Sequence, residues 1–74
     1  MKTIDVRDMA PRERHPLIFK ELAELKMGEA LEIVNDHDPK PLLYQLAAEY
    51  KDMYGWEYKE AGPDDWRVVL KRLD

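Results

Sequence analysis

Apolar residues recur along the chain at spacings that alternate between those of strands and those of helices. The first run, TIDV (3–6), is rich in β-branched residues and is typical of a short strand. In LIFKELAELKM (17–27), Ile18, Leu22 and Leu25 recur at i, i+4 and i+7. This spacing predicts a helix with one buried face, and the charged stretch before it allows the helix to begin a turn earlier.

A second strand and a second helix are expected next. Gly28 is expected to end the first helix, and ALEIV (30–34) is a mostly apolar run that predicts a strand. The segment PLLYQLAAEYKDMY (41–54) returns to helical spacing, and Gly55 is expected to end that helix. Its expected buried face consists of Leu43, Leu46, Ala47 and Tyr50.

Two further strands complete the pattern: WEYKE (56–60) and WRVVLKRL (66–73), joined by a turn with Gly-Pro chemistry. The order β-α-β-α-β-β predicts an α/β (α+β) two-layer sandwich. It would consist of a four-stranded mixed sheet with two helices on one face, because right-handed crossovers place both helices on the same side. The other face of the sheet is expected to carry Glu57, Lys59, Arg67 and Lys71, with Val69 among them.

Length and charge narrow the class of protein. The 74 residues are expected to form a single domain, 1–74, too small to enclose a large internal cavity. The formal net charge is −4, with acidic and basic residues mixed along the chain. Because a nucleic-acid-binding surface needs clustered basic residues, no nucleic-acid partner is expected.

The absence of cysteine excludes several kinds of chemistry. A chain without cysteine has no disulfide, no thiolate nucleophile, no persulfide and no Cys-ligated zinc. No apolar run approaches the roughly 18 residues of a membrane span, and the N-terminus has no signal-like apolar core. A cytoplasmic protein without a membrane partner is therefore expected.

The segment NDHDPKPL (35–42) is dense in charge and contains a histidine and two prolines. Asp38 is a favoured N-cap, and a proline in the first helical turn loses no hydrogen bond, so this segment is expected to start a helix. Pro16 is expected to be a first-turn proline of the first helix in the same way.

These two helix starts are expected to form one edge of the sheet. If the first two strands are parallel, both strand-to-helix turns lie at the carboxyl edge, where open α/β folds tend to bind ligands. His15 and His37, the only histidines, would then be neighbours in space. The predicted ligand-binding residues of this edge are Arg12, Arg14, His15, Asp36, His37 and Lys40.

Three uses of this edge are open. The arginines, the lysine and the helix N-termini could hold an anionic ligand or a partner protein. His15, His37 and Asp36 (or Asp38) could form a two-His-one-carboxylate site for iron, copper or zinc. The polar residues could also serve only as helix caps. An acid–base pair of Glu13 and His37 is conceivable, but no other catalytic motif accompanies it, so an enzyme is not expected.

Three motifs, ERHPLIF (13–19), NDHDPKPLLYQ (35–45) and the W-E-Y…G-P…W-R-V pattern near the end, resemble a small bacterial family, domain of unknown function 2249. That family is grouped with the TusA-like (SirA-like) sulfur carriers, so the resemblance implies the same β-α-β-α-β-β fold and a single TusA-like domain. Sulfur carriers hold a persulfide on a cysteine that opens the first helix. Ala10 and Pro11 occupy that place here.

The resemblance also implies an accessory role. Members of that family occur attached to hemerythrin-like or cupin-like modules, which suggests redox proteins as partners. The leading hypothesis is a non-enzymatic module that binds a partner protein or a small anionic ligand at the edge described above. The alternatives are a metal-binding redox accessory domain with His15 and His37 as ligands, and a sulfur-relay accessory protein that uses a partner's cysteine.

Overall fold

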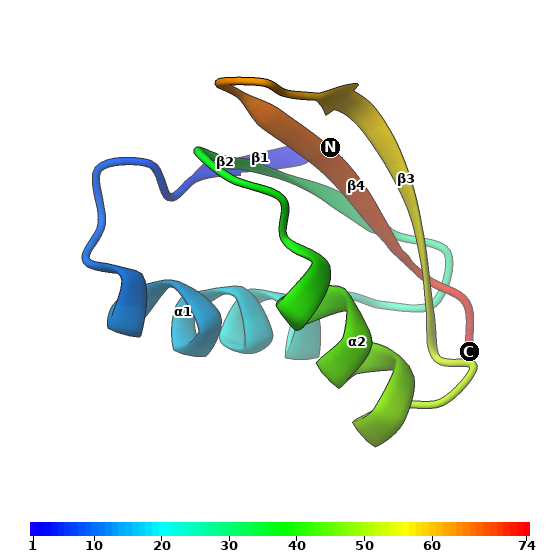
Figure 1. The fold of residues 1–74 in the computed structure, drawn as a ribbon. Helices are drawn as coiled ribbons and strands as arrows, with labels where there is room; N and C mark the ends of the chain where they lie inside the picture. Colours follow the sequence, from blue (N-terminus) through cyan, green and yellow to red (C-terminus); the bar gives the residue numbers. More distant parts are fainter.

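The computed structural model describes all residues, 1–74, and contains the six predicted elements in the predicted order. Both helices lie on one face of a four-stranded sheet of order β1-β2-β4-β3 (Figure 1). The two-layer α+β architecture is therefore confirmed. The elements are β1 (Lys2–Asp5), α1 (Pro11–Ala23), β2 (Ala30–Asn35), α2 (Lys40–Glu49), β3 (Tyr54–Ala61) and β4 (Trp66–Arg72).

The sheet is mixed, and its one parallel pair positions the site. Strands β1 and β2 are parallel, with Ile4 opposite Ile33. Strand β4 runs antiparallel to both β2 and β3. Because β1 and β2 point the same way, the turns that follow them lie at the same edge of the sheet, as the sequence predicts.

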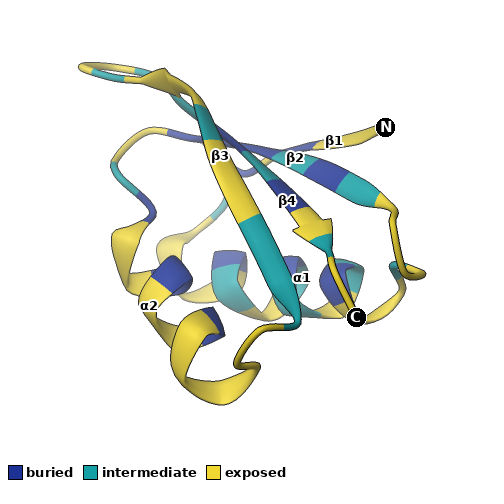
Figure 2. Ribbon diagram, turned by 90° about the vertical axis from the view of Figure 1, so that its right-hand side faces the viewer, coloured by how far each residue is buried: buried dark blue, intermediate teal, exposed yellow.

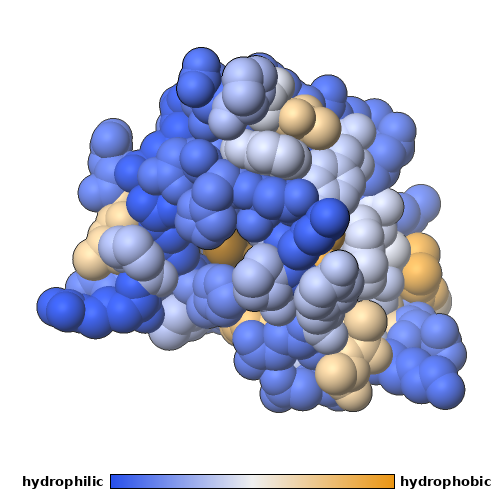
Figure 3. Space-filling model, in the orientation of Figure 1, coloured by the Kyte–Doolittle hydropathy of each residue, from blue (hydrophilic) through white to orange (hydrophobic).

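The core lies between the sheet and the helices, where the buried segments of both layers face each other (Figure 2). In β4, Val68 and Leu70 are buried while Val69 and Lys71 point outward, so the strand alternates as expected. The face seen in Figure 3 is mostly hydrophilic, with hydrophobic atoms only in small separate areas. The core residues are Ile4, Val6, Ile18, Leu22, Leu31, Ile33, Leu42, Leu43, Leu46, Val68 and Leu70.

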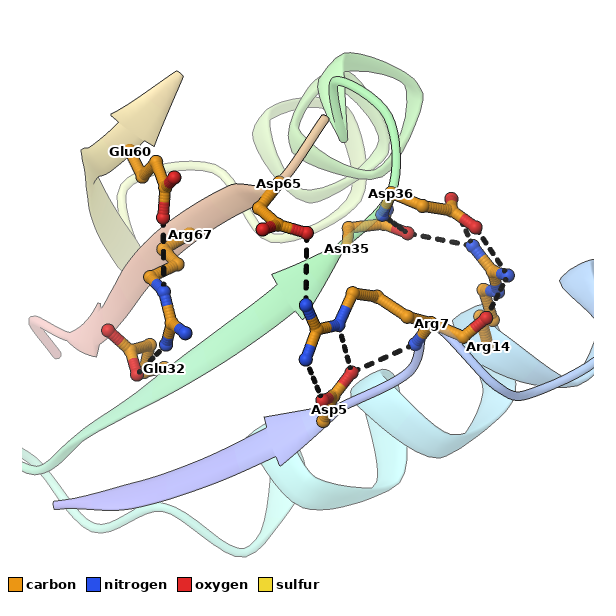
Figure 4. Close-up of polar contacts among 9 residues, drawn as sticks. All are labelled: Asp5, Arg7, Arg14, Glu32, Asn35, Asp36, Glu60, Asp65 and Arg67. Atoms are coloured by element: carbon orange, nitrogen blue, oxygen red, sulfur yellow. Dashed lines mark hydrogen bonds and ion pairs between the residues drawn. The ribbon is translucent and has the colours of Figure 1, made fainter. Parts of the chain in front are cut away.

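The sheet face away from the helices carries a row of polar contacts (Figure 4). Arg67 Nε lies 3.2 Å from Glu60 Oε1, and Arg67 Nη1 lies 3.5 Å from Glu32 Oε1. Glu32 also accepts a hydrogen bond from the Thr3 hydroxyl at 3.2 Å. These contacts connect all four strands, because Thr3 lies in β1, Glu32 in β2, Glu60 in β3 and Arg67 in β4. This face of the sheet is therefore polar, and its charged side chains pair with one another.

Helix α1 begins and ends earlier than its apolar spacing alone predicts. Pro11 opens the helix, so Pro16 lies inside it and the expectation of a first-turn position for Pro16 is wrong. The helix ends at Ala23, and Gly28 is not its stop signal. Gly28 instead sits in a turn with φ of 87°, where its N–H donates to the carbonyl of Arg72 at 2.9 Å.

Helix α2 is also shorter than expected. It begins at Lys40, whose N–H donates to Asp38 Oδ1 at 3.1 Å, although the cap position itself is taken by Pro39. It ends at Glu49, and Gly55 lies within β3 and not at the helix end. Neither helix is long and apolar enough to cross a membrane.

Candidate functional site

A cavity of about 100 Å³ opens at the carboxyl edge of the sheet, between α1 and the turn that leads from β2 to α2. His15 and His37, 22 positions apart in the sequence, both line it. The cavity therefore joins the start of α1 to the turn after β2, and it brings the two histidines to one place as the sequence analysis expected. The complete lining is Pro11, Arg14, His15, Ile18, Asn35, His37 and Leu42.

Arg14 is the structural centre of this edge. It is only 6% exposed, and all five N–H groups of its guanidinium are engaged within the protein. Figure 4 shows its contacts with Arg7, Asn35 and Asp36. Nε donates to the carbonyl of Met9 at 3.0 Å, and Nη2 donates to the carbonyl of Arg7 at 3.1 Å. The remaining contacts of the guanidinium reach the end of β2. They are made with Asn35 Oδ1 at 2.8 Å, Asp36 Oδ1 at 2.7 Å and Asp36 Oδ2 at 3.1 Å.

This arrangement changes the role expected for Arg14. Since each of its N–H groups already has an acceptor, none is left to bind a ligand. Its function in the structure is to tie the turn after β1 to the end of β2. Arg14, one of the predicted binding residues, therefore has a structural role at the site and does not contact a ligand through its guanidinium.

Asp36 and His37 form the polar rim next to Arg14. Hydrogen bonds from Arg14, and then from His37, hold the pKa of Asp36 well below its usual range, so this carboxylate is ionised. His37 Nδ1 lies 2.7 Å from Asp36 Oδ1 and must carry the proton of that hydrogen bond. The free ring atom of His37 is therefore Nε2. His37 makes no hydrogen bond or ion pair with Glu13, the pairing that the sequence allowed but did not favour; its partner is Asp36.

Asn35, the last residue of β2, is a lining residue that the sequence analysis missed. It is 5% exposed, and its Oδ1 accepts from Arg14 Nη1 at 2.8 Å and from the N–H of Asp36 at 3.0 Å. Two donors at one atom fix that atom as the oxygen, so the NH₂ group points the other way and makes no hydrogen bond within the protein. The sequence does contain a signal for this role, because Asn35 is a polar residue that directly follows the apolar residues of the predicted strand 30–34.

Arg12 and Lys40 lie on the exposed first turns of the two helices. Arg12 has no hydrogen-bonding or ion-pair partner, and Lys40 Nζ is 3.9 Å from Asp38 Oδ2. Asp38 also accepts a hydrogen bond from the Tyr58 hydroxyl at 2.6 Å. Burial, together with this contact, raises the pKa of Tyr58 to about 12. Neither basic side chain lines the cavity; both are exposed on the helix turns beside it.

The predicted metal site is not assembled as a ligand cluster. No group of three or more His, Cys, Asp or Glu side chains is placed to hold a metal ion. The two candidate carboxylates are otherwise engaged, Asp36 with Arg14 and Asp38 with Tyr58. Two imidazoles at one cavity remain, so metal binding by His15 and His37 stays a prediction.

Comparisons with known proteins agree with this architecture. A family model described as "Uncharacterized conserved protein (DUF2249)" matches residues 3–72. The crystal structure of the SirA-like protein from Desulfitobacterium hafniense is similar over 100% of both chains, with a TM-score of 0.76 and 23% sequence identity. At that identity the likeness shows the fold alone. None of the curated proteins searched matches the sequence.

Proposed function

Because this chain belongs to the DUF2249 family and has a SirA-like fold without a cysteine, we propose that it is a small non-enzymatic accessory module. Its ligand is a small anion or an anionic group of a partner protein. The binding site is the cavity at the carboxyl edge, together with the basic residues on its rim. A persulfide relay would need the thiol of a partner, since the chain has none.

The observation that carries this proposal is the single cavity that residues of α1 line on one side and the end of β2 with the β2–α2 turn on the other. Arg14 fixes the two turns relative to each other through contacts with Arg7, Met9, Asn35 and Asp36. The cavity thus has a rigid polar base, while the imidazoles and the Asn35 NH₂ group keep free hydrogen-bonding positions.

Three features favour an anion. Pro11 lines the cavity and is the first residue of α1, whose N-terminus carries partial positive charge. Arg12 and Lys40 are exposed cations on the first turns of the two helices. Asp36 is paired with Arg14 at 2.7 Å, so its charge is compensated within the protein.

The test is a titration followed by two-dimensional ¹H–¹⁵N NMR, with acetate and inorganic phosphate as separate probes at constant ionic strength. Saturable shifts are expected at residues of the two turns. The double variant Arg12→Ala/Lys40→Ala should weaken binding several-fold. The matched control, Lys59→Ala/Lys71→Ala, removes two cations from the opposite sheet face and should leave binding unchanged. If neither probe produces a saturable shift at this edge, the proposed function is wrong.

The position of His15 and His37 at one cavity favours a second candidate, a metal-binding accessory domain that serves a redox partner. Two imidazoles with open positions beside them suit iron, copper or zinc. Titration with each metal, repeated on His15→Ala and His37→Ala, separates the two functions. An unchanged stoichiometry in both variants would remove the metal site.

A further inference from the structure

The Asn35 side chain supplies a buried hydrogen-bond donor that the folded protein does not use. Every side-chain nitrogen or oxygen that is fully sealed from solvent has a partner, so the unpaired NH₂ group of Asn35 is not sealed. Asn35 is nevertheless 95% buried and lines the cavity. Its NH₂ group therefore reaches solvent through the cavity, and the acceptor it needs must come from a molecule that enters there.

His37 supplies the second directed group. Its Nδ1 is committed to Asp36 at 2.7 Å, which leaves Nε2 as the ring atom available to a ligand. The ring lines the same cavity as Asn35. The two groups arise two residues apart at the end of β2, so they approach the cavity from the same side.

The remaining lining residues limit what can bind. Arg14 has no free N–H group, Pro11 has none on its backbone, and Ile18 and Leu42 are apolar. His15 is the one other polar lining residue with unused positions, and its ring comes from α1 and not from the end of β2. A cavity of about 100 Å³ has room for a small polar group. Asn35 and His37 thus present two neighbouring directed groups from the end of β2, which match the two oxygens of a planar carboxyl group.

We infer that the cavity binds a carboxyl group, with Asn35 donating its N–H to one oxygen and one proton shared between His37 Nε2 and the other oxygen. This inference rests on the proposed function and names the ligand class of the same site. The carboxyl group belongs either to a small carboxylic acid or to the end of a partner chain. Asn35 is then a specificity-determining residue that rejects ligands without a carbonyl-type oxygen.

The chain permits a direct readout of this contact. Asn35 is its only asparagine and Gln45, exposed on α2, is its only glutamine, so an ¹H–¹⁵N spectrum contains two side-chain NH₂ pairs. Acetate, N-acetylglycine, phosphate and acetamide serve as separate probes. Both carboxylates should shift the Asn35 pair saturably and leave the Gln45 pair in place. Tighter binding of N-acetylglycine than of acetate would identify a chain end as the source.

Asn35→Asp tests the donor with minimal change of shape, because the variant keeps an oxygen for Arg14 and for the Asp36 N–H. Acetate binding should weaken at least tenfold. The matched control Gln45→Glu makes the same chemical change at an exposed site and should bind like the wild type.

Two outcomes would overturn the inference. An Asn35 NH₂ pair that stays fixed while His15 and His37 signals shift would leave the binding edge intact but remove Asn35 from it. Phosphate binding more tightly than acetate would refute the carboxyl class while leaving the proposed function standing, and acetamide binding more tightly than both anions would refute the proposed function too. No shift of any residue with any probe would overturn the proposed function as well.

Discussion

The replacement Arg14→Met tests whether the guanidinium holds the site edge together. Methionine keeps an apolar stem of similar length and removes the five N–H groups, so the change isolates the hydrogen bonds from the packing. In the wild type, Arg14 serves three neutral acceptors, which are the carbonyls of Arg7 and Met9 and the side-chain oxygen of Asn35.

The expected loss follows from those three acceptors. At about 1 kcal/mol for each hydrogen bond, removing them lowers the free energy of unfolding by about 3 kcal/mol. The ion pair with Asp36 adds little, because the Asp36 side chain is 46% exposed and water replaces the lost contact. A domain of this size has a free energy of unfolding on the order of 4–11 kcal/mol, so the loss is a large fraction of the total.

Urea denaturation followed by tryptophan fluorescence and far-UV circular dichroism measures this loss. Arg12→Met is the matched control, since Arg12 lies on the same helix, is exposed and has no partner; it should change the free energy of unfolding by less than about 0.5 kcal/mol. An Arg14→Met protein as stable as the Arg12→Met protein would refute the assignment of Arg14 as the tie between the two turns.

Three further predictions concern single residues. Gly62→Ala should cost about 2 kcal/mol or more in thermal denaturation, because Gly62 has φ of 75° and a Cβ there would lie 2.6 Å from the Trp66 ring; a loss below 0.5 kcal/mol would contradict this. The pKa of Asp36 is lower in the folded state than its unfolded value of about 3.9, so its contribution to stability is present above that value and is lost as the pH falls below it. Urea denaturation between about pH 5 and pH 2.5 should therefore show falling stability, with a shallower fall in Asp36→Asn; equal slopes would argue against the effect. Tyr58→Phe should cost about 1 kcal/mol through the lost contact with Asp38 and should abolish a phenolate absorbance step near pH 12, whereas a step that persists in the variant would assign it to another tyrosine.

The arrangement of the elements could be predicted because periodicity, strand order and crossover handedness all point to one architecture. The ends of the helices could not be predicted, because they depend on contacts with residues that are distant in the sequence. Leu25 has the spacing of a helix face and does pack against the core, yet it lies beyond the end of α1. Arg72 donates to the carbonyl of Leu25 at 2.6 Å and accepts from Gly28, so the end of β4 holds this segment away from the helix.

The end of α2 was mispredicted for a related reason. Asp52 takes the left-handed conformation, with φ of 63°, that a glycine would usually supply. Gly55 instead lies in β3 beneath Leu73, whose side chain would be 3.4 Å from a Cβ at that position. A glycine can be present because the backbone needs a positive φ or because another side chain packs closely against it. The sequence does not distinguish these two reasons, which is why the prediction that Gly55 ends the helix is wrong.

At the site, the meeting of the two turns could be predicted because it depends only on parallel pairing of β1 and β2. The assignment of hydrogen bonds within the cluster could not. Of several basic residues near the edge, burial selects Arg14 as the internal one, and its five donors then determine the orientation of Asn35. Burial and orientation of this kind arise from packing and have no local signature.

The guanidinium of Arg14 also has a thermodynamic consequence for recognition. Because it locks both turns during folding, the conformational entropy of those turns is lost before any ligand arrives, and the site is preorganised. Association should therefore carry little ordering cost and little structural adaptation. Weakening this lock would transfer the ordering cost to the binding step, so affinity would fall even where no atom that touches the ligand has changed.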